Sequence, residues 1–189
     1  MYSPIRTALL ATLTCAVVAG AQTQAGQPAA AYPEAGHAAP AFSATATDST
    51  GKTIPVSLSA LRGKVVVLAF YPGDRTRGCT VELGKFRDEY TSLFGDGVVV
   101  LPTSVDTLQS HASWAHDAHF PFAMIADPQS QVATMYGSQG MNPGRKAFQR
   151  TVFVIGKDGN IAYTDTKFNA LAQDGYDKLA AAIKSAKGM

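Results

Sequence analysis

Cysteine and excess charge are both scarce in this sequence. Its 189 residues include two cysteines, Cys15 and Cys79, and 16 basic residues stand against 14 acidic ones, for a formal net charge of +2. No block of like charges marks a surface for nucleic acid or for a membrane. Nothing resembles a phosphate-binding loop or a nucleotide fingerprint, and no internal repeat is visible. The length suggests one domain of ordinary globular composition.

The first 21 residues have the pattern of a cleaved secretory signal. Arg6 supplies a positive start, Ala8 to Ala19 form an apolar stretch, and Ala19-Gly20-Ala21 is a small-residue cleavage site. The apolar stretch is shorter than the ~20 residues that cross a bilayer as a helix, so stable membrane insertion is not expected. The sequence therefore predicts an exported protein, periplasmic or secreted. Acylation of Cys15, as in a lipoprotein, ranks below simple secretion because the apolar run continues past this residue.

Removal of residues 1–21 leaves Cys79 as the sole thiol. An exported protein with one cysteine cannot use an internal disulfide for stability. Cys79 is then either an inert buried thiol or a thiol kept for its chemistry. Residues 22–39 are rich in Ala, Gln, Gly and Pro without apolar periodicity, which predicts a flexible linker. The folded domain is expected to span residues 40–189.

Strand and helix patterns alternate through this expected domain. Two short alternating segments joined by a turn predict an N-terminal β-hairpin. Two continuously apolar runs predict buried strands, and apolar residues at helical spacing follow each of them. The pattern predicts an α/β domain with a central mixed β-sheet flanked by helices. The expected strands lie at 42–46, 54–58, 65–70, 98–101, 151–155 and 161–164, and the expected helices at about 79–93, 108–119, 127–136 and from 174 onward.

Cys79 lies where an expected strand passes into an expected helix. The apolar run Val65 to Phe70 ends at Pro72, and helical spacing begins at or just before Cys79. The start of a helix presents unpaired backbone N–H groups and the positive end of the helix dipole. Arg75 and Arg77 add positive charge nearby in sequence. All of these features favour a thiolate, so the local sequence predicts a reactive thiol.

The residues around Cys79 also resemble a known family. Pro72-x-x-x-Thr76-x-x-Cys79 is similar to the active-site pattern of the peroxiredoxins. The extension through Thr80, Glu82, Phe86, Arg87 and Asp88 resembles their bacterioferritin-comigratory (Q-type) branch. Further matches follow in the family's order at 40–42, 51–52, 61–64, 104–106, 121–122, 127–128, 136–137 and 150–153. The resemblance implies a thioredoxin-like fold and a thiol-dependent peroxidase that reduces hydrogen peroxide or organic hydroperoxides.

Peroxide reduction gives four residues an expected role. The thiolate attacks one peroxide oxygen while negative charge gathers on the other, so the site needs aimed donors and shielding from water. Cys79 is the expected nucleophile, and Thr76 can place its hydroxyl against sulfur and peroxide. Pro72 shields the sulfur and fixes the turn through its locked φ. Arg150, which the resemblance identifies as the active-site arginine, stays charged and offers several donors in one plane.

Each of these assignments has a structural alternative. Cys79 could be a core thiol, Thr76 a helix cap, and Arg150 a partner in a surface ion pair. Glu82 could orient Arg150 or the turn, or could lie on a solvated helix face. Tyr71 could line the pocket or pack in the core.

The sequence also predicts how the catalytic cycle closes. In many members of the branch a second cysteine lies five residues after the first, but position 84 is glycine here. A sulfenic acid on Cys79 then needs an external thiol, from an exported thioredoxin-like protein or a small thiol such as glutathione. The resemblance implies a monomer, and no cofactor or metal is expected. Arg77 stands where the branch more often has proline.

Two other functions share the expected fold. An exported thiol–disulfide oxidoreductase needs two nearby cysteines, but Glu82 stands where Cys-x-x-Cys would place the second. A metal-delivery protein usually pairs a two-cysteine motif with histidine. His111, His116 and His119 have no cysteine or acidic cluster beside them in sequence, and a solvated helix face explains them better than a zinc site. The peroxidase is therefore the favoured interpretation.

Overall fold

A seven-stranded mixed sheet forms the centre of the computed structural model, which describes residues 31–140 and 147–188. The strand order is β2-β1-β5-β4-β3-β6-β7. The pairs β3/β4 and β4/β5 are parallel, and the other neighbours are antiparallel. The strands are β1 (Ser43–Thr47), β2 (Thr53–Ser57), β3 (Val65–Phe70), β4 (Val98–Ser104), β5 (Met124–Ala126), β6 (Thr151–Ile155) and β7 (Ile161–Asp165).

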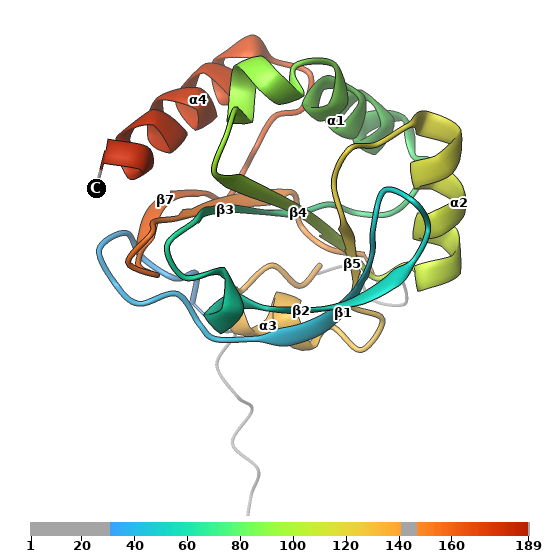
Figure 1. Ribbon diagram of the computed structural model, residues 1–189, viewed down its shortest axis with the longest axis horizontal. Helices are drawn as coiled ribbons and strands as arrows, with labels where there is room; N and C mark the ends of the chain where they lie inside the picture. The colour runs from blue at the N-terminus through green and yellow to red at the C-terminus, as the bar shows by residue number, and fades with distance from the viewer. Residues whose placement is uncertain (1–30, 141–146, 189) are drawn as a thin grey trace, which may run out of the picture.

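Helices cover both faces of this sheet. Figure 1 shows α1 and α4 along one face, α2 beside them near β1 and β5, and α3 on the opposite face. The helices are α1 (Arg77–Asp88), α2 (Leu108–Ala118), α3 (Gln131–Met135) and α4 (Gln173–Gly188). A 3₁₀ turn, η1 (Leu58–Leu61), precedes β3, and a π-helical turn, η2 (Tyr90–Phe94), follows α1.

Strand β3 divides the hydrophobic core into two halves, because successive side chains of a strand point to opposite faces. Val65, Val67 and Ala69 pack with residues of α1, α2 and α4, whereas Val66, Leu68 and Phe70 pack with residues of α3 and the N-terminal hairpin. All six residues of β3 are buried. The strand that leads to Cys79 is therefore enclosed on both faces, and the residues that follow it start from a fixed point.

One strand of the sheet, β5, was not expected from the sequence. The expected elements agree with the structure, with three further differences. The helix expected to run to residue 93 ends at Asp88 and continues as η2. The helix expected from residue 127 begins at Gln131, because the Asp127 carboxylate accepts hydrogen bonds from the backbone N–H groups of Gln131 and Ala133 and so caps the helix. The third difference is at the start of the domain.

The packed part of the chain begins before the expected boundary at Pro40. Tyr32 donates its hydroxyl to Gln149, and the N–H groups of Gly36 and Ala39 donate to Ile161 and Gly159 in the β6–β7 hairpin. Composition alone does not reveal such backbone pairing. The expected signal at 1–21 and the first half of the expected linker at 22–39 lie outside the described residues. No helix among residues 31–140 and 147–188 has the length and apolar character needed to cross a membrane.

Candidate active site

The sheet brings Cys79 and Arg150 together across 71 residues of sequence. Strands β3 and β6 are antiparallel neighbours, and their register pairs Phe70 at the end of β3 with Thr151 at the start of β6. The residue before β6 and the turn after β3 therefore meet at one edge of the sheet. Arg150 extends from this edge, and its Nη2 donates to the Sγ of Cys79 at 3.3 Å.

Cys79 is the third residue of α1, whose N-cap is Thr76. At this position the sulfur lies beside the first turn of the helix, where backbone N–H groups lack intrahelical partners and the dipole is positive. The side chain is fully buried and is a free thiol. Its contact with a guanidinium group distinguishes it from a core thiol with only apolar neighbours.

Glu82 holds the other end of the same guanidinium group. Its side chain is fully buried and forms an ion pair with Nη1 of Arg150, whose side chain is 18% exposed. Glu82 lies one turn after Cys79 on α1, so both side chains reach Arg150 from one helix. The carboxylate fixes the plane of the guanidinium while Nη2 remains directed at the sulfur. Of the alternatives for Glu82, the structure shows the orienting contact and not the solvated helix face.

Thr76 and Pro72 line a cleft in front of this pair. The cleft has a volume of about 670 Å³, and its lining also includes Arg150, Phe148 and Phe168. The Thr76 hydroxyl donates to the carbonyl oxygen of Gly73 at 3.2 Å and makes no side-chain capping bond to α1. This differs from the expected direct contact of the hydroxyl with sulfur, but it leaves the lone pairs of the hydroxyl oxygen available to accept a hydrogen bond. The structure thus gathers all four expected residues, three lining the cleft and Cys79 buried beside Arg150.

Gly78 was not expected to matter, but it makes room for Arg150. A Cβ atom built on Gly78 would lie 3.1 Å from Nη2 of Arg150, tighter than ordinary van der Waals contact. Any larger residue must therefore displace the guanidinium from its place beside Cys79. The family pattern gives no reason to notice this position, because it leaves the residue before the cysteine open.

The substitution Gly78→Ala should therefore slow oxidation of Cys79 by peroxide. We expect a loss of roughly tenfold, since a shift of about 1 Å in a catalytic group can cost 10²-fold. Alanine should also stabilise the helix by about 0.5–1 kcal/mol, so activity and stability should change in opposite directions. The matched control is Gly84→Ala on the same helix, where nothing lies within 4 Å of the added Cβ. Equal peroxide rates for Gly78→Ala and Gly84→Ala would show that the close approach has no role.

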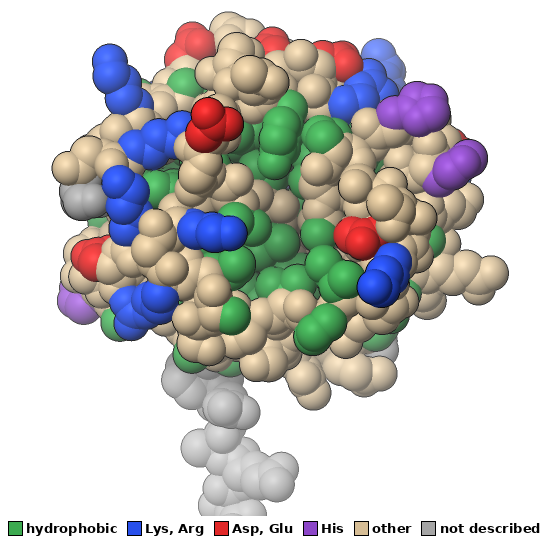
Figure 2. Space-filling model, viewed as in Figure 1, with side chains coloured by type: hydrophobic (Ala, Val, Ile, Leu, Met, Phe, Trp, Pro, Cys, Tyr) green, Lys and Arg blue, Asp and Glu red, His purple; other side chains and the backbone are tan. Residues whose placement is uncertain are grey.

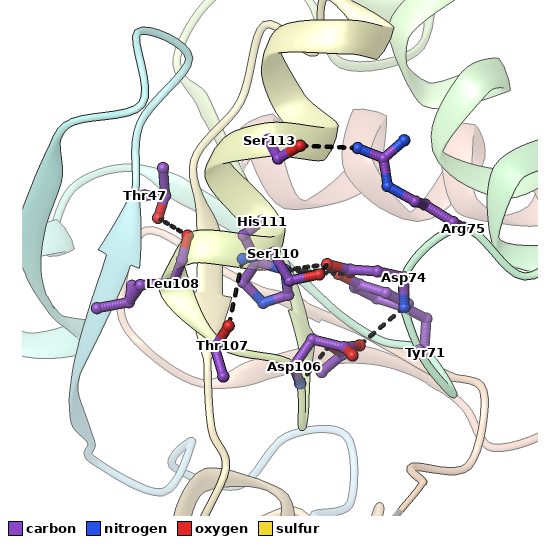
Figure 3. Close-up of polar contacts among 12 residues, drawn as sticks. Thr47, Tyr71, Asp74, Arg75, Asp106, Thr107, Leu108, Ser110, His111 and Ser113 are labelled. Atoms are coloured by element: carbon purple, nitrogen blue, oxygen red, sulfur yellow. Dashed lines mark hydrogen bonds and ion pairs between the residues drawn. The ribbon is translucent and has the colours of Figure 1, made fainter.

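Two arginines of the turn lie apart from the sulfur. Arg75, expected to add charge near Cys79, instead donates Nη2 to Asp117 at 2.7 Å and to Ser113 at 3.0 Å, both on α2. Figure 3 shows its side chain extending toward α2. This hydrogen bond holds the pKa of Asp117 below its ordinary value. Arg77 is exposed at the first position of α1.

The histidines of α2 do not share one environment. His116 and His119 are exposed, as expected of a solvated helix face, and Figure 2 shows histidine side chains at the surface over α2. His111 is fully buried, so the expectation was wrong for this residue. It lies one turn before Trp114 and Ala115, the other buried residues of the helix, and that spacing could have placed it on the inner face. No group of three metal-binding side chains occurs in the described part of the chain.

Tyr71 and Asp74 share this buried environment with His111. Tyr71 is fully buried and does not line the cleft, so it belongs to the core. Its hydroxyl donates to Asp74 at 2.7 Å. Burial and the neighbouring Asp74 charge raise the pKa of Tyr71 well above its ordinary value, so the hydroxyl stays protonated and donates. No role was expected for Asp74, because two of its partners, Ser110 and His111, come from α2.

Comparisons with known proteins identify the family of this chain. The AhpC/TSA family matches residues 35–164. A peroxiredoxin bcp of Coxiella burnetii is 37% identical over 133 residues, which cover 68% of this chain and 85% of that protein. A chloroplastic peroxiredoxin Q of Triticum aestivum is 37% identical over 123 residues. These residues cover 63% of this chain and 54%, about half, of that protein. The crystal structure of peroxidoxin BcpB from Mycobacterium tuberculosis has a TM-score of 0.71 at 27% identity and covers 82% of this chain and 98% of its own.

A thioredoxin-like domain with a thiol at a helix start, held against an arginine at the wall of a cleft, is typical of the peroxiredoxin class of thiol peroxidases. The chain belongs to the AhpC/TSA family, in the bacterioferritin-comigratory (Q-type) branch of the peroxiredoxins.

Proposed function

We propose that the protein reduces peroxides in a one-cysteine cycle, with Cys79 as nucleophile and an external thiol as reductant. The observation that carries the proposal is the 3.3 Å contact between Nη2 of Arg150 and the Sγ of Cys79 at the start of α1. A fixed positive group at this distance stabilises the thiolate. The same group is close enough to stabilise the charge that develops on the peroxide during attack.

The first step transfers one oxygen atom to the sulfur. The Cys79 thiolate attacks the terminal oxygen of a hydroperoxide, the O–O bond breaks, and the leaving alkoxide or hydroxide takes a proton to become alcohol or water. Cys79 becomes a sulfenic acid. Arg150 donates to the reacting atoms, and the Thr76 oxygen accepts a hydrogen bond from the peroxide. Pro72 shields the sulfur from water. The cleft in front of these residues admits hydrogen peroxide or an organic hydroperoxide.

The second half of the cycle needs thiols from outside the chain. An external thiol condenses with the sulfenic acid, releasing water and forming a mixed disulfide, and a second thiol then displaces Cys79. Gly84 stands where many members of the branch have the second cysteine. We infer that the protein is exported by its N-terminal segment and acts as a monomer. Its reductant is then an exported thioredoxin-like protein or a small thiol.

Peroxide treatment without a reductant should leave one stable sulfenic acid per chain. Dimedone, which traps sulfenic acids, should label the tryptic peptide 78–85 that carries Cys79, with one label per molecule. The protein should remain monomeric on a non-reducing gel. Without dimedone, excess peroxide should convert the sulfenic acid irreversibly to sulfinic acid.

A Cys15→Ser chain is the matched control for the second cysteine of the sequence. Its labelling should equal that of the unmodified chain. A Cys79–Cys79 dimer as the main product would refute the one-cysteine cycle, because the partner molecule would then supply the resolving thiol. A Cys15–Cys79 disulfide would refute it as well, and peptide mapping detects both.

A further inference from the structure

A buried polar cluster joins the turn before Cys79 to helix α2. Asp74, in the turn, accepts hydrogen bonds through its carboxylate from Tyr71, from Ser110 at 2.6 Å and from Nδ1 of His111 at 2.9 Å. The Asp74 side chain is 4% exposed and the His111 side chain is fully buried. Figure 3 shows the three donors directed at Asp74 from the turn and from α2. None of these contacts belongs to the chemistry assigned to Arg150, Thr76 and Pro72.

His111 bridges the turn and β5 through its two ring nitrogens. Nδ1 lies 2.9 Å from the Asp74 carboxylate, and Nε2 lies 3.2 Å from the carbonyl oxygen of Ile125 in β5. A carboxylate only accepts hydrogen bonds, so Nδ1 is the donor to Asp74. The ring therefore connects the turn to the sheet through Asp74. Burial alone would raise the pKa of Asp74, but the hydrogen bonds from His111, Ser110 and Tyr71 hold it below its ordinary value.

A second contact fixes the backbone at the same residue. The N–H of Asp74 donates to Oδ2 of Asp106 at 2.8 Å, and that oxygen also accepts from the hydroxyl of Ser104 at 2.8 Å. Strands β3 and β4 are parallel, with Phe70 paired to Thr103, so the turn after β3 and the segment after β4 emerge at one edge of the sheet. The turn is thus held through both its side chain and its main chain.

The position of Asp74 makes this attachment relevant to the site. Asp74 lies two residues after Pro72 and two before Thr76, both of which line the cleft. Arg75, between Asp74 and Thr76, has a positive φ of 58°, a conformation that a non-glycine residue keeps only when its surroundings impose it. The hydrogen bond between His111 and Asp74 supplies such a constraint. Without it the turn can relax, and Thr76 and the start of α1 can move relative to Arg150.

We propose that His111 is a positioning residue, whose ring holds Asp74 through the Nδ1 hydrogen bond so that the turn keeps Thr76 in place and Cys79 enclosed. This inference rests on the proposed peroxidase function for its effect on rate. Loosening the contact between His111 and Asp74 should have opposite effects on two reactions of Cys79. Attack on peroxide should slow because Thr76 and Cys79 lose alignment with Arg150. Alkylation by iodoacetamide should quicken because the fully buried sulfur becomes accessible more often.

Two variants at position 111 separate this role from mere stability. In His111→Asn the amide nitrogen can take the place of Nδ1 and donate to Asp74. In His111→Gln the amide can take the place of Nε2 near Ile125, while the bond to Asp74 is lost. Val132→Ala removes buried volume on the opposite face of the sheet and serves as the control for lost stability. Both rates are measured by mass spectrometry in the tryptic peptide 78–85, which excludes Cys15.

In His111→Gln the rate at which peroxide oxidises Cys79 should fall roughly tenfold or more. The reason is that a shift of about 1 Å between Thr76, Cys79 and Arg150 can cost up to 10²-fold in rate. The alkylation rate of His111→Gln should rise, whereas His111→Asn should keep both rates near those of the unmodified protein. Equal rates in His111→Gln and His111→Asn, whether both normal or both impaired, would overturn the inference. If neither variant folds, Ser110→Ala decides, because it removes one hydrogen bond to Asp74 and should shift both rates in the same directions. Unchanged rates in Ser110→Ala would then contradict the positioning role of the contacts to Asp74.

The test also separates this inference from the proposed function. If the unmodified protein reacts with peroxide no faster than free cysteine, the peroxidase proposal fails. The alkylation rates still report whether His111 keeps the turn closed. If the unmodified protein reacts rapidly and the variants do not differ, the peroxidase stands and the positioning role of His111 fails.

Discussion

Replacing Cys79 with serine should abolish peroxide reduction and leave the fold intact. Serine is nearly the same size as cysteine, so the buried site retains its packing, but its hydroxyl is not deprotonated at neutral pH and cannot replace the thiolate. Loss of a nucleophile typically costs several orders of magnitude, so residual turnover should lie below about a hundredth of the original rate. Consumption of hydrogen peroxide with an excess of dithiothreitol measures this turnover.

The control for this experiment is Cys15→Ser. It removes the other thiol of the sequence and should keep full activity. Thermal unfolding of Cys79→Ser should match that of the original protein and so exclude a loss of fold. Turnover in Cys79→Ser above a hundredth of the original rate would mean that another group, Cys15 included, performs the chemistry.

Replacing Arg150 with methionine should slow peroxide attack even at a pH where the thiolate is fully formed. Methionine keeps an unbranched stem of similar bulk but removes the guanidinium donor that lies 3.3 Å from the sulfur. Removal of one donor that stabilises a developing oxyanion costs about 10²–10³-fold in rate, and we expect a loss of this size. A pH profile of the second-order rate constant separates this effect from any change in thiolate formation.

Glu82 complicates the interpretation of that variant. Without Arg150 its buried carboxylate loses its partner, and breaking a buried ion pair in this way costs about 3–5 kcal/mol of stability. The double variant Arg150→Met/Glu82→Gln removes the stranded charge and should recover stability without recovering rate. Arg62→Met, which removes an exposed arginine near Gly159, is the control for net charge. If the second-order rate constant of Arg150→Met at high pH equalled that of the original protein, Arg150 would only stabilise the thiolate before reaction and would have no role in the transition state.

The buried strands and the helix start at Cys79 were predictable from sequence because they rest on local patterns. The apolar run Val65 to Phe70 is buried on both faces, as expected, and so is Thr151 to Ile155. The helix start at Cys79 follows from the turn residues before it. The pairing of Cys79 with Arg150 is different, since it depends on strand register across 71 residues, and only the family resemblance supplied it.

The parts that escaped prediction depend on contacts between elements. In the sequence Asp74 is an ordinary turn residue. Only the fold shows that Ser110 and His111 of α2 contact its carboxylate. In the sequence Gly78 is only a residue of low helix propensity. The fold shows that the guanidinium of Arg150 occupies the place next to its Cα where a side chain would begin. The expectation that Arg75 adds positive charge beside Cys79 rested on its position in the sequence. In the structure Arg75 pairs with Asp117 on α2 and not with the thiol.

The rate at which hydrogen peroxide oxidises Cys79 tests the central claim most directly. Rapid quenching followed by analysis of the tryptic peptide 78–85 gives the second-order rate constant for this thiol alone. With Arg150 and the start of α1 stabilising the thiolate and the transition state, the rate constant should exceed that of free cysteine at the same pH by at least about a hundredfold. A rate constant equal to that of free cysteine would contradict the account, because Cys79 would then be a buried thiol without activation.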